Sequence, residues 1–312
     1  MNTTSQPSTT NLMTLHRTNG SYSECLPIHE YSTFVYVVIA IISVISVTAF
    51  CTNLVIICTI GMTQSLQTPS NILILNLAIS DLLGGLFCQP FYCAFKFSEM
   101  ICDTELLLLT RTMYDAIVWI VSPVSFMIVV AIIADRFLAI QLHLRYQELV
   151  TTRRYALALS FIWVLSFIFS LCKAMFYSIS LHVVVIIFLT CLIFIALYFL
   201  SVIFRVIRRH SLQIQVQQQS VQQSIDMPRY KKSVNTMYYV IGGFVLCNVP
   251  IVGAITTHLI LGKISLTLIF FYTISETLLM LNGVVNPIIY CWRIQEIRNA
   301  ARHLLSKICT RG

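Results

Sequence analysis

Seven apolar stretches divide this chain of 312 residues, and each is long enough to cross a lipid bilayer as a helix. A helical span needs about 20 apolar residues. We place the spans at 34–60, 69–95, 104–140, 153–174, 179–207, 231–261 and 265–291. The chain is 57% hydrophobic and only 10% charged, which is too apolar for a water-soluble domain of this length. The sequence therefore predicts an all-α membrane protein with a bundle of seven transmembrane helices.

The distribution of Lys and Arg gives this bundle an orientation. Basic residues gather after the third and fifth spans and in the C-terminal tail, whereas few lie on the opposite side. Loops rich in Lys and Arg remain in the cytoplasm. We therefore expect a multi-pass protein of the plasma membrane with its N-terminus outside and its C-terminus inside. The net charge of +8 follows from this topology, so it does not indicate a nucleic-acid partner.

We divide the chain into an extracellular arm (1–33), a transmembrane domain (34–291) and a cytoplasmic amphipathic helix with a short tail (292–312). Asn2 and Asn19 begin glycosylation sequons on the expected outer side. In the tail, apolar residues recur at helical spacing and basic residues fill the other face, as in a helix that lies on membrane lipids.

Three cysteines are candidates for modification. Cys25 and Cys102 could tie the arm to the first outer loop, although pairing cannot be deduced from sequence alone. Cys309 ends the amphipathic segment and is a candidate for palmitoylation. An unmodified interfacial cysteine is the open alternative.

Two polar motifs lie at positions where contact with lipid is unfavourable for polar groups. Asp135-Arg136-Phe137 ends the third span, and Asn286-Pro287-Ile288-Ile289-Tyr290 lies inside the seventh. Charges at the membrane edge and prolines within a span both carry a free-energy cost in a bilayer. We interpret both motifs as parts that move helices. Further polar or aromatic markers stand in the other spans, namely Asn53, Leu77–Asp81, Trp163, Tyr198 and Phe244–Pro250.

With these motifs in this order, residues 34–309 resemble the rhodopsin-like (class A) G-protein-coupled receptors. The resemblance implies a receptor that couples an extracellular ligand to a heterotrimeric G protein. It also implies that Asp135 holds Arg136 at rest, with a simple ion-paired anchor as the alternative. The activation switch that it implies comprises Asp135, Arg136, Tyr198, Pro250, Asn286, Pro287 and Tyr290.

Departures from the family pattern narrow the resemblance. Arg111 stands where most members have a disulfide cysteine, Thr190 replaces a proline and Asn248 replaces a tryptophan. The missing cysteine, the missing proline and a short second outer loop together resemble the branch of melanocortin, lysophospholipid, cannabinoid and adenosine receptors, and the melanocortin type most. Tyr230 stands where many members have an acid that latches onto Arg136, so we expect basal signalling.

A deep polar cluster is the second feature that the resemblance implies. Asp81, Ser125, Asn282 and Asn286 match positions at which the family coordinates a sodium ion, the one cofactor that we expect. A carboxylate at mid-membrane depth needs a partner. The open alternative is a neutral Asp81 that is hydrogen-bonded to Asn53, Asn282 and Asn286.

The outer pocket should contain two acids, Asp115 and Glu276. Arg111 lies four residues before Asp115 on the same helical face and could neutralise it. Glu276 would then be the freer acid, which favours a cationic or amphiphilic ligand. The candidate ligand-binding residues are Asp115, Glu276, Tyr114, Trp119 and Asn248.

Other ligand and function classes fit less well. Val118 replaces the aspartate of amine receptors, and Met280 replaces the lysine that binds retinal in opsins. No nucleophile–base or metal-ligand spacing indicates an enzyme. A transporter or channel would require a continuous polar path and inverted repeats, and neither is visible. A receptor-like protein that binds without signalling remains an alternative, because Asn248 and the missing disulfide depart from the family.

Overall fold

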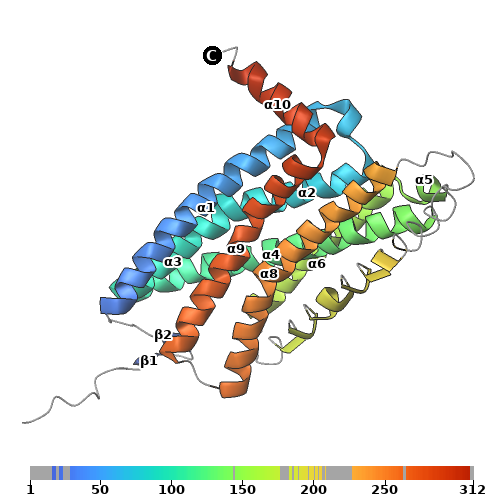
Figure 1. The fold of residues 1–312 in the computed structure, drawn as a ribbon. Helices are drawn as coiled ribbons and strands as arrows, with labels where there is room; N and C mark the ends of the chain where they lie inside the picture. Colours follow the sequence, from blue (N-terminus) through green and yellow to red (C-terminus); the bar gives the residue numbers. More distant parts are fainter. Residues whose placement is uncertain are drawn as a thin grey trace, which may run out of the picture.

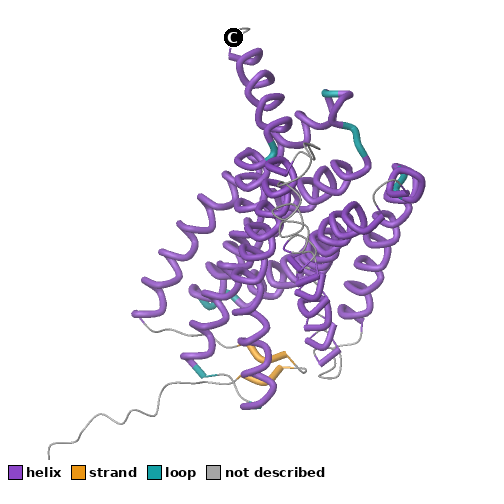
Figure 2. Tube along the Cα trace, turned by 45° about the vertical axis from the view of Figure 1, so that its right-hand side comes forward, coloured by secondary structure: helices purple, strands orange, loops and turns teal. Residues whose placement is uncertain are grey.

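The computed structural model describes residues 16–18, 21–23, 29–142, 145–175, 227–262 and 265–309. Between 183 and 208 it describes 183–184, 186–188, 190–195, 197–199, 201–202, 204–205 and 208. Figure 1 shows long helices side by side in one elongated bundle, with a small hairpin at one end and the C-terminal helix at the other. In Figure 2, helix accounts for almost all of the described chain.

The predicted membrane-spanning helices are confirmed wherever the structure describes them. Within the described residues, six helical segments are long and apolar enough to cross a membrane. The described residues of the fifth predicted span, 179–207, are also helical. The long elements are α1 (His29–Met62), α2 (Pro69–Leu83), α3 (Gln89–Ile101), α4 (Thr104–Leu142), α6 (Thr152–Met175), α8 (Met227–Leu261) and α9 (Leu266–Arg293).

Short elements join or follow the long helices. They are η1 (Gln64–Leu66), η2 (Gly84–Cys88), α5 (Tyr146–Leu149) and α10 (Gln295–Cys309). Strands β1 (His16–Thr18) and β2 (Ser21–Ser23) form an antiparallel pair in which His16 is opposite Ser23. This hairpin lies in the arm for which no secondary structure was predicted.

Polar side chains mark where several helices begin. The Thr68 hydroxyl accepts a hydrogen bond from the Asn71 amide, and Pro69 occupies the first position of α2. The Ser265 hydroxyl accepts from the Leu268 amide in the same way at the start of α9. Such caps satisfy amides that have no partner within the helix, and proline has no amide to satisfy at that position.

The second predicted span is interrupted by the π turn η2, where the Gln89 amide bonds to the Gly84 carbonyl five residues back. The Gly85 carbonyl accepts a 2.6 Å hydrogen bond from the Ser46 hydroxyl of α1. A Cβ atom at Gly85 would lie 3.0 Å from the Phe50 nitrogen and from the Ser46 carbonyl oxygen. Only glycine allows α1 and the π turn to approach this closely.

The core of the bundle is apolar and aromatic. Phe126 on α4 and Phe244 on α8 pack with ring centroids 4.4 Å apart. Both belong to a cluster of buried side chains that joins α1, α2, α4, α6, α8, α9 and α10. Pro250 lies inside α8 and Pro287 inside α9, and these two helices pack along one another. Both prolines therefore remove hydrogen bonds within continuous helices.

The tail forms the predicted amphipathic helix. Ile297 and Ala301 of α10 are buried, and α10 contacts α1 and α9. Cys309 is its last residue. Predictions for Asn2, Asn19 and Cys25 concern positions outside the described residues.

Candidate functional site

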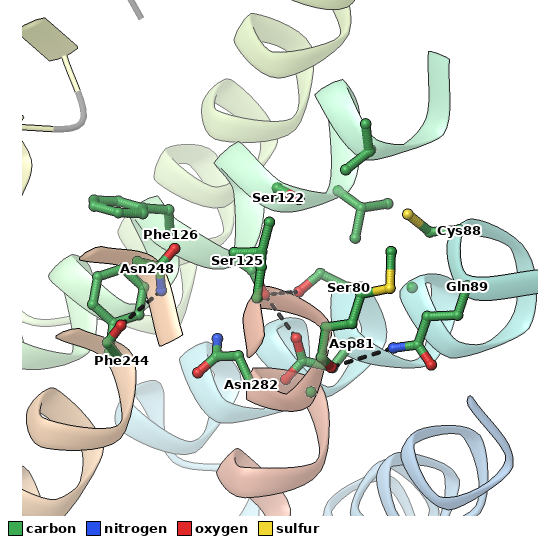
Figure 3. A pocket seen from close by; sticks show the side chains of 16 residues that line it. Ser80, Asp81, Cys88, Gln89, Ser122, Ser125, Phe126, Phe244, Asn248 and Asn282 are labelled. Carbon is green, nitrogen blue, oxygen red and sulfur yellow. Dashed lines mark hydrogen bonds between the residues drawn. The ribbon is translucent and has the colours of Figure 1, made fainter. Parts of the chain in front are cut away.

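A polar cluster surrounds Asp81 in the middle of the bundle (Figure 3). Asp81 on α2 is only 7% exposed. The Ser125 hydroxyl of α4 donates to Asp81 Oδ1 at 2.7 Å, and the Asn286 amide nitrogen of α9 donates to Oδ2 at 2.9 Å. Ser80 and Ser125 are joined by a 3.1 Å hydrogen bond. Three helices therefore meet at one carboxylate.

The other two asparagines expected around Asp81 do not bond to it. The Asn53 amide nitrogen donates to the carbonyls of Ala49 and Gly283, both at 2.8 Å. Asn282 is 6% exposed, and its Oδ1 atom has no hydrogen-bond partner among the described residues. The arrangement in which Asn53, Asn282 and Asn286 all hold Asp81 is therefore wrong, because Asn53 bonds to backbone carbonyls instead.

A cavity of about 60 Å³ adjoins this cluster. Asp81, Ser125 and Asn282 line it, and so do Gln89 and Asn248. The carboxylate, hydroxyl and amide oxygens of the first three residues are ligands that hard cations prefer. The Asn282 Oδ1 atom is buried without a hydrogen-bond partner among the described residues, which indicates that a water or an ion binds beside it. Asp81, Ser125 and Asn282 thus offer the ligand chemistry that such an ion needs, whereas Asn286 does not line the cavity and donates through its nitrogen to Asp81.

A second cluster lies at the end of α4, where Arg136 Nη2 is 2.9 Å from Asp135 Oδ2. Asp135 is 1% exposed and accepts three further hydrogen bonds. The Tyr146 and Tyr155 hydroxyls donate to Oδ1, each at 2.6 Å, and the Ser70 hydroxyl donates to Oδ2 at 3.0 Å. Burial and the hydrogen bond to Asp135 raise the pKa of Tyr146 above its ordinary value.

The remaining residues of the predicted switch occupy different environments. Tyr290 is 3% exposed, whereas Tyr198 is 60% exposed and contacts the ring of Phe199. Phe137 packs against the same Phe199 ring, and the two ring centroids are 5.0 Å apart. The Tyr230 side chain lies outside the described part of the chain. In this structure Tyr290, but not Tyr198, is packed inside the bundle.

The C-terminal part of α3 contains a charged cluster that the sequence did not predict. Lys96 Nζ lies 3.0 Å from Glu99 Oε2, and their side chains are only 6% and 14% exposed. The Tyr31 hydroxyl of α1 donates to the same oxygen at 2.7 Å. Glu276 on α9 lies within electrostatic range of Lys96 but forms no salt bridge with it among the described residues. Lys96 is therefore paired with Glu99.

Two other candidate ligand residues have different neighbours. Tyr114 is buried against Tyr92, with ring centroids 5.1 Å apart. Trp119 lies beneath Lys173, whose Nζ is 3.3 Å from the ring centroid. Among the described residues no salt bridge joins Arg111 to Asp115, so the expected pairing is not formed.

Asp115 is instead coupled electrostatically to Lys173 of α6. Asn248 lines the deep cavity, and its amide nitrogen donates to the Phe244 carbonyl at 2.8 Å. The five ligand candidates are thus distributed over three separate places, and only Asn248 borders the cavity that also contains Asp81.

Comparison with known proteins gives a family match over part of the chain. Residues 52–182 match the family described as 7 transmembrane receptor (rhodopsin family). The chain is similar to the high-affinity lysophosphatidic acid receptor of Xenopus laevis, with 25% identity over 89% of this chain and 84% of that receptor.

Two further relatives match shorter segments of the chain. The histamine H2 receptor of Cavia porcellus is 30% identical over 47% of this chain and 40% of that receptor. The adenosine receptor A2b of Rattus norvegicus is 31% identical over 41% of this chain and 37% of that receptor. The chain thus aligns with less than half the length of the histamine and adenosine receptors. This match and the membrane-length helices confirm the predicted fold class, an all-α membrane protein, and the matched family is one of receptors and not of enzymes.

Two sets of polar contacts were not predicted from the sequence. Ser70, Tyr146 and Tyr155 all bond to Asp135 from other segments. Lys96 and Glu99 form an ion pair three residues apart, which the spacing on a helix could have indicated. The tyrosines gave no such signal, because their contacts with Asp135 depend on how the helices pack.

Proposed function

We propose that this chain is a plasma-membrane receptor that couples an extracellular ligand to a heterotrimeric G protein, with its N-terminus outside and its C-terminus inside. The observation that carries this proposal is the Asp135–Arg136 pair at the end of α4. Asp135 is fully buried, whereas the Arg136 side chain is 34% exposed. An exposed guanidinium held by one buried carboxylate can be released to a partner once the helices move.

The test is G-protein activation in cells that express the chain or its Arg136→Ala variant. The matched control is Arg153→Ala, because Arg153 is exposed at the start of α6. We expect nucleotide exchange on at least one Gα class above mock-transfected cells, loss of that exchange in Arg136→Ala and no loss in the control. Surface expression without activation of any Gα class would instead support the alternative of a binding protein that does not signal.

We also propose basal signalling without ligand. Among the described residues, Asp135 is the only salt-bridge partner of Arg136. A second acid at Tyr230 would have added a latch between the third and sixth spans, and the sequence has none there. Second-messenger levels equal to those of mock-transfected cells at matched surface expression would contradict this part of the proposal.

A cationic or amphiphilic ligand is the class that the outer charges support. Lys96 pairs with Glu99, whereas Glu276 has no salt-bridge partner among the described residues. A ligand cation would compensate the negative charge of Glu276. The names of the relatives point to histamine, lysophosphatidic acid and adenosine, so they do not select one class. A melanocortin-type ligand stays a prediction.

A panel of small amphiphilic amines and their carboxylate counterparts tests this ligand class. We expect the amines to change G-protein activation and Glu276→Gln to weaken their potency by about tenfold, as for one lost charged hydrogen bond. Glu105→Gln is the control, because Glu105 is an acid in the first turn of α4. Equal potency in the wild type and Glu276→Gln would remove Glu276 from the pocket.

We further propose that Asp81, Ser125, Asn282 and Asn286 hold a sodium ion, whose positive charge would neutralise the buried carboxylate. The unpaired Asn282 oxygen beside Asp81 supports this proposal. Asp81→Asn is expected to remove any sodium dependence of the receptor's thermal stability. Sodium-dependent stability that persists in Asp81→Asn would contradict the assignment.

A further inference from the structure

Gln89 is a buried glutamine with one half of its amide unpaired. It is the first residue of α3, directly after the π turn, and is 3% exposed. Its amide nitrogen donates to the Met280 carbonyl of α9 at 3.3 Å. Its Oε1 atom has no hydrogen-bond partner among the described residues. A buried carbonyl oxygen destabilises the fold unless water or another donor reaches it.

Gln89 lines the same cavity as Asp81 (Figure 3). The cavity volume of about 60 Å³ has room for several waters, since one water needs roughly 10–15 Å³ of such space. Ser80 and Ser122 also line it, and so does Asn282 with the second unpaired oxygen. Two unpaired carbonyl oxygens and one carboxylate therefore line a single small cavity whose other walls are largely apolar.

Waters around a cation point their hydrogens away from the ion. An acceptor at the far side of the cavity can therefore bind the hydration shell even when it does not touch the ion. Gln89 lies eight residues after Asp81, so it is placed along the bundle from the carboxylate. The bond from its nitrogen to Met280 fixes the amide plane and leaves the oxygen as the available acceptor.

We propose that Gln89 is a positioning residue for a hydrated sodium ion at Asp81, with Oε1 accepting a hydrogen bond from a water of the ion's shell. This inference rests on the sodium site proposed above and adds a residue outside that ligand set. It also gives the glutamine two separable functions. The nitrogen anchors α3 to α9, and the oxygen tunes the affinity for sodium.

The test is thermal unfolding of the purified full chain in detergent during titration with NaCl, with N-methylglucamine chloride holding the ionic strength constant. We expect the wild-type Tm to rise with NaCl and not with KCl at the same concentrations. Gln89→Leu should raise the half-maximal NaCl concentration about three- to tenfold, the effect of one lost hydrogen bond. Gln89→Glu keeps an oxygen but loses the amide donor, and it should lower that concentration.

The matched control is Gln67→Leu. Gln67 is an exposed glutamine whose amide nitrogen also donates to a backbone carbonyl, that of Gly61 at 3.0 Å, and it does not line the cavity. We expect its sodium titration to match that of the wild type. If Gln89→Leu gives no cooperative unfolding transition, Gln89→Met provides the same comparison with a side chain of nearly equal length.

Two outcomes would overturn the role of Gln89 while leaving the Asp81 site intact. One is an unchanged titration in Gln89→Leu. The other is equal weakening in Gln89→Leu and Gln89→Glu, which would assign the effect to the lost bond with Met280. A wild-type Tm that does not respond to sodium would overturn both proposals. No G protein takes part, so each result is separate from the test of receptor signalling.

Discussion

The Tyr155 hydroxyl of α6 lies 2.6 Å from the Oδ1 atom of Asp135 on α4. Tyr146 of α5 donates to the same oxygen, and Ser70 of α2 donates to the other. One buried carboxylate thus connects four segments while it pairs with Arg136. The position of Arg136 therefore depends on side chains well outside the Asp-Arg motif.

Replacing Tyr155 with phenylalanine should loosen this connection. We expect Tyr155→Phe to raise basal G-protein activation about two- to fivefold, because Asp135 loses one of its four donors and holds Arg136 less firmly. A hydrogen bond to a charged group is worth about 1.5–3 kcal/mol, and the remaining donors compensate in part. The measurement is nucleotide exchange in membranes at matched receptor density.

The control for this change is Tyr36→Phe, since Tyr36 is 57% exposed on α1. Its basal exchange should equal that of the wild type. Basal exchange in Tyr155→Phe that is equal to or lower than that of the control would show that the hydroxyl does not restrain Arg136.

Tyr146 should make the stability of the folded protein depend on pH in the alkaline range. Its pKa is raised in the folded state by burial and by the bond to Asp135, whereas the unfolded value is about 10. The folded state therefore keeps a proton that the unfolded state loses, so this stabilisation is complete below pH 10 and declines as the pH rises above it.

We expect the Tm of the wild type to fall more steeply between pH 9.5 and 11 than that of Tyr146→Phe. The difference should be a fraction of the roughly 1.4 kcal/mol per pH unit that one proton can contribute, because Tyr146 is only partly buried. Other tyrosines titrate in both chains and cancel in the comparison. Parallel slopes would contradict the prediction.

Because Lys96 and Glu99 form an ion pair, we expect mutations of the two residues to have non-additive effects on the free energy of unfolding. Lys96→Met alone should destabilise the chain by about 2–3 kcal/mol, because it leaves Glu99 ionised and nearly buried without its cation. Lys96→Met with Glu99→Gln should be less destabilising than Lys96→Met alone. Denaturant unfolding in detergent measures both, and a double variant as unstable as the sum of the two single variants would refute the coupling.

Gly85 predicts a steric effect at the π turn. Gly85→Ala should lower the free energy of unfolding by about 1–3 kcal/mol, because its Cβ would meet two backbone atoms of α1 at 3.0 Å. Gly242→Ala is the control, since a Cβ there has nothing within 4 Å and alanine favours the helix. The two Tm values should move in opposite directions. A stable Gly85→Ala variant would mean that α1 can shift away.

Helix positions were largely predictable because the bilayer imposes a length on every apolar run. The third span was expected at 104–140 and α4 ends at Leu142, and the seventh was expected at 265–291 and α9 ends at Arg293. The second was expected to end at 95, whereas α3 continues to Ile101. Lys96 and Glu99 pair with one another in this additional segment.

The candidate site was predictable only where a motif carries it. Asp81, Ser125 and Asn286 were expected together and are joined by hydrogen bonds. Asn53 was expected to bond to Asp81 but donates to backbone carbonyls. The bond to Gly283 depends on how closely α1 approaches α9. The Tyr155–Asp135 contact likewise depends on the packing of α6 against α4, and nothing in the local sequence encodes it.

The π turn after Gly84 has a consequence for the numbering of inward-facing positions. One additional residue in a regular α-helix would rotate everything beyond it by about 100°, the angle that one residue covers. The wider π turn absorbs that residue, so removing one residue from Gly84–Cys88 and restoring regular α-helix would leave Lys96 and Glu99 facing as they do now. Alignments with regular α-helices therefore need a one-residue gap here to relate residues that face the same direction.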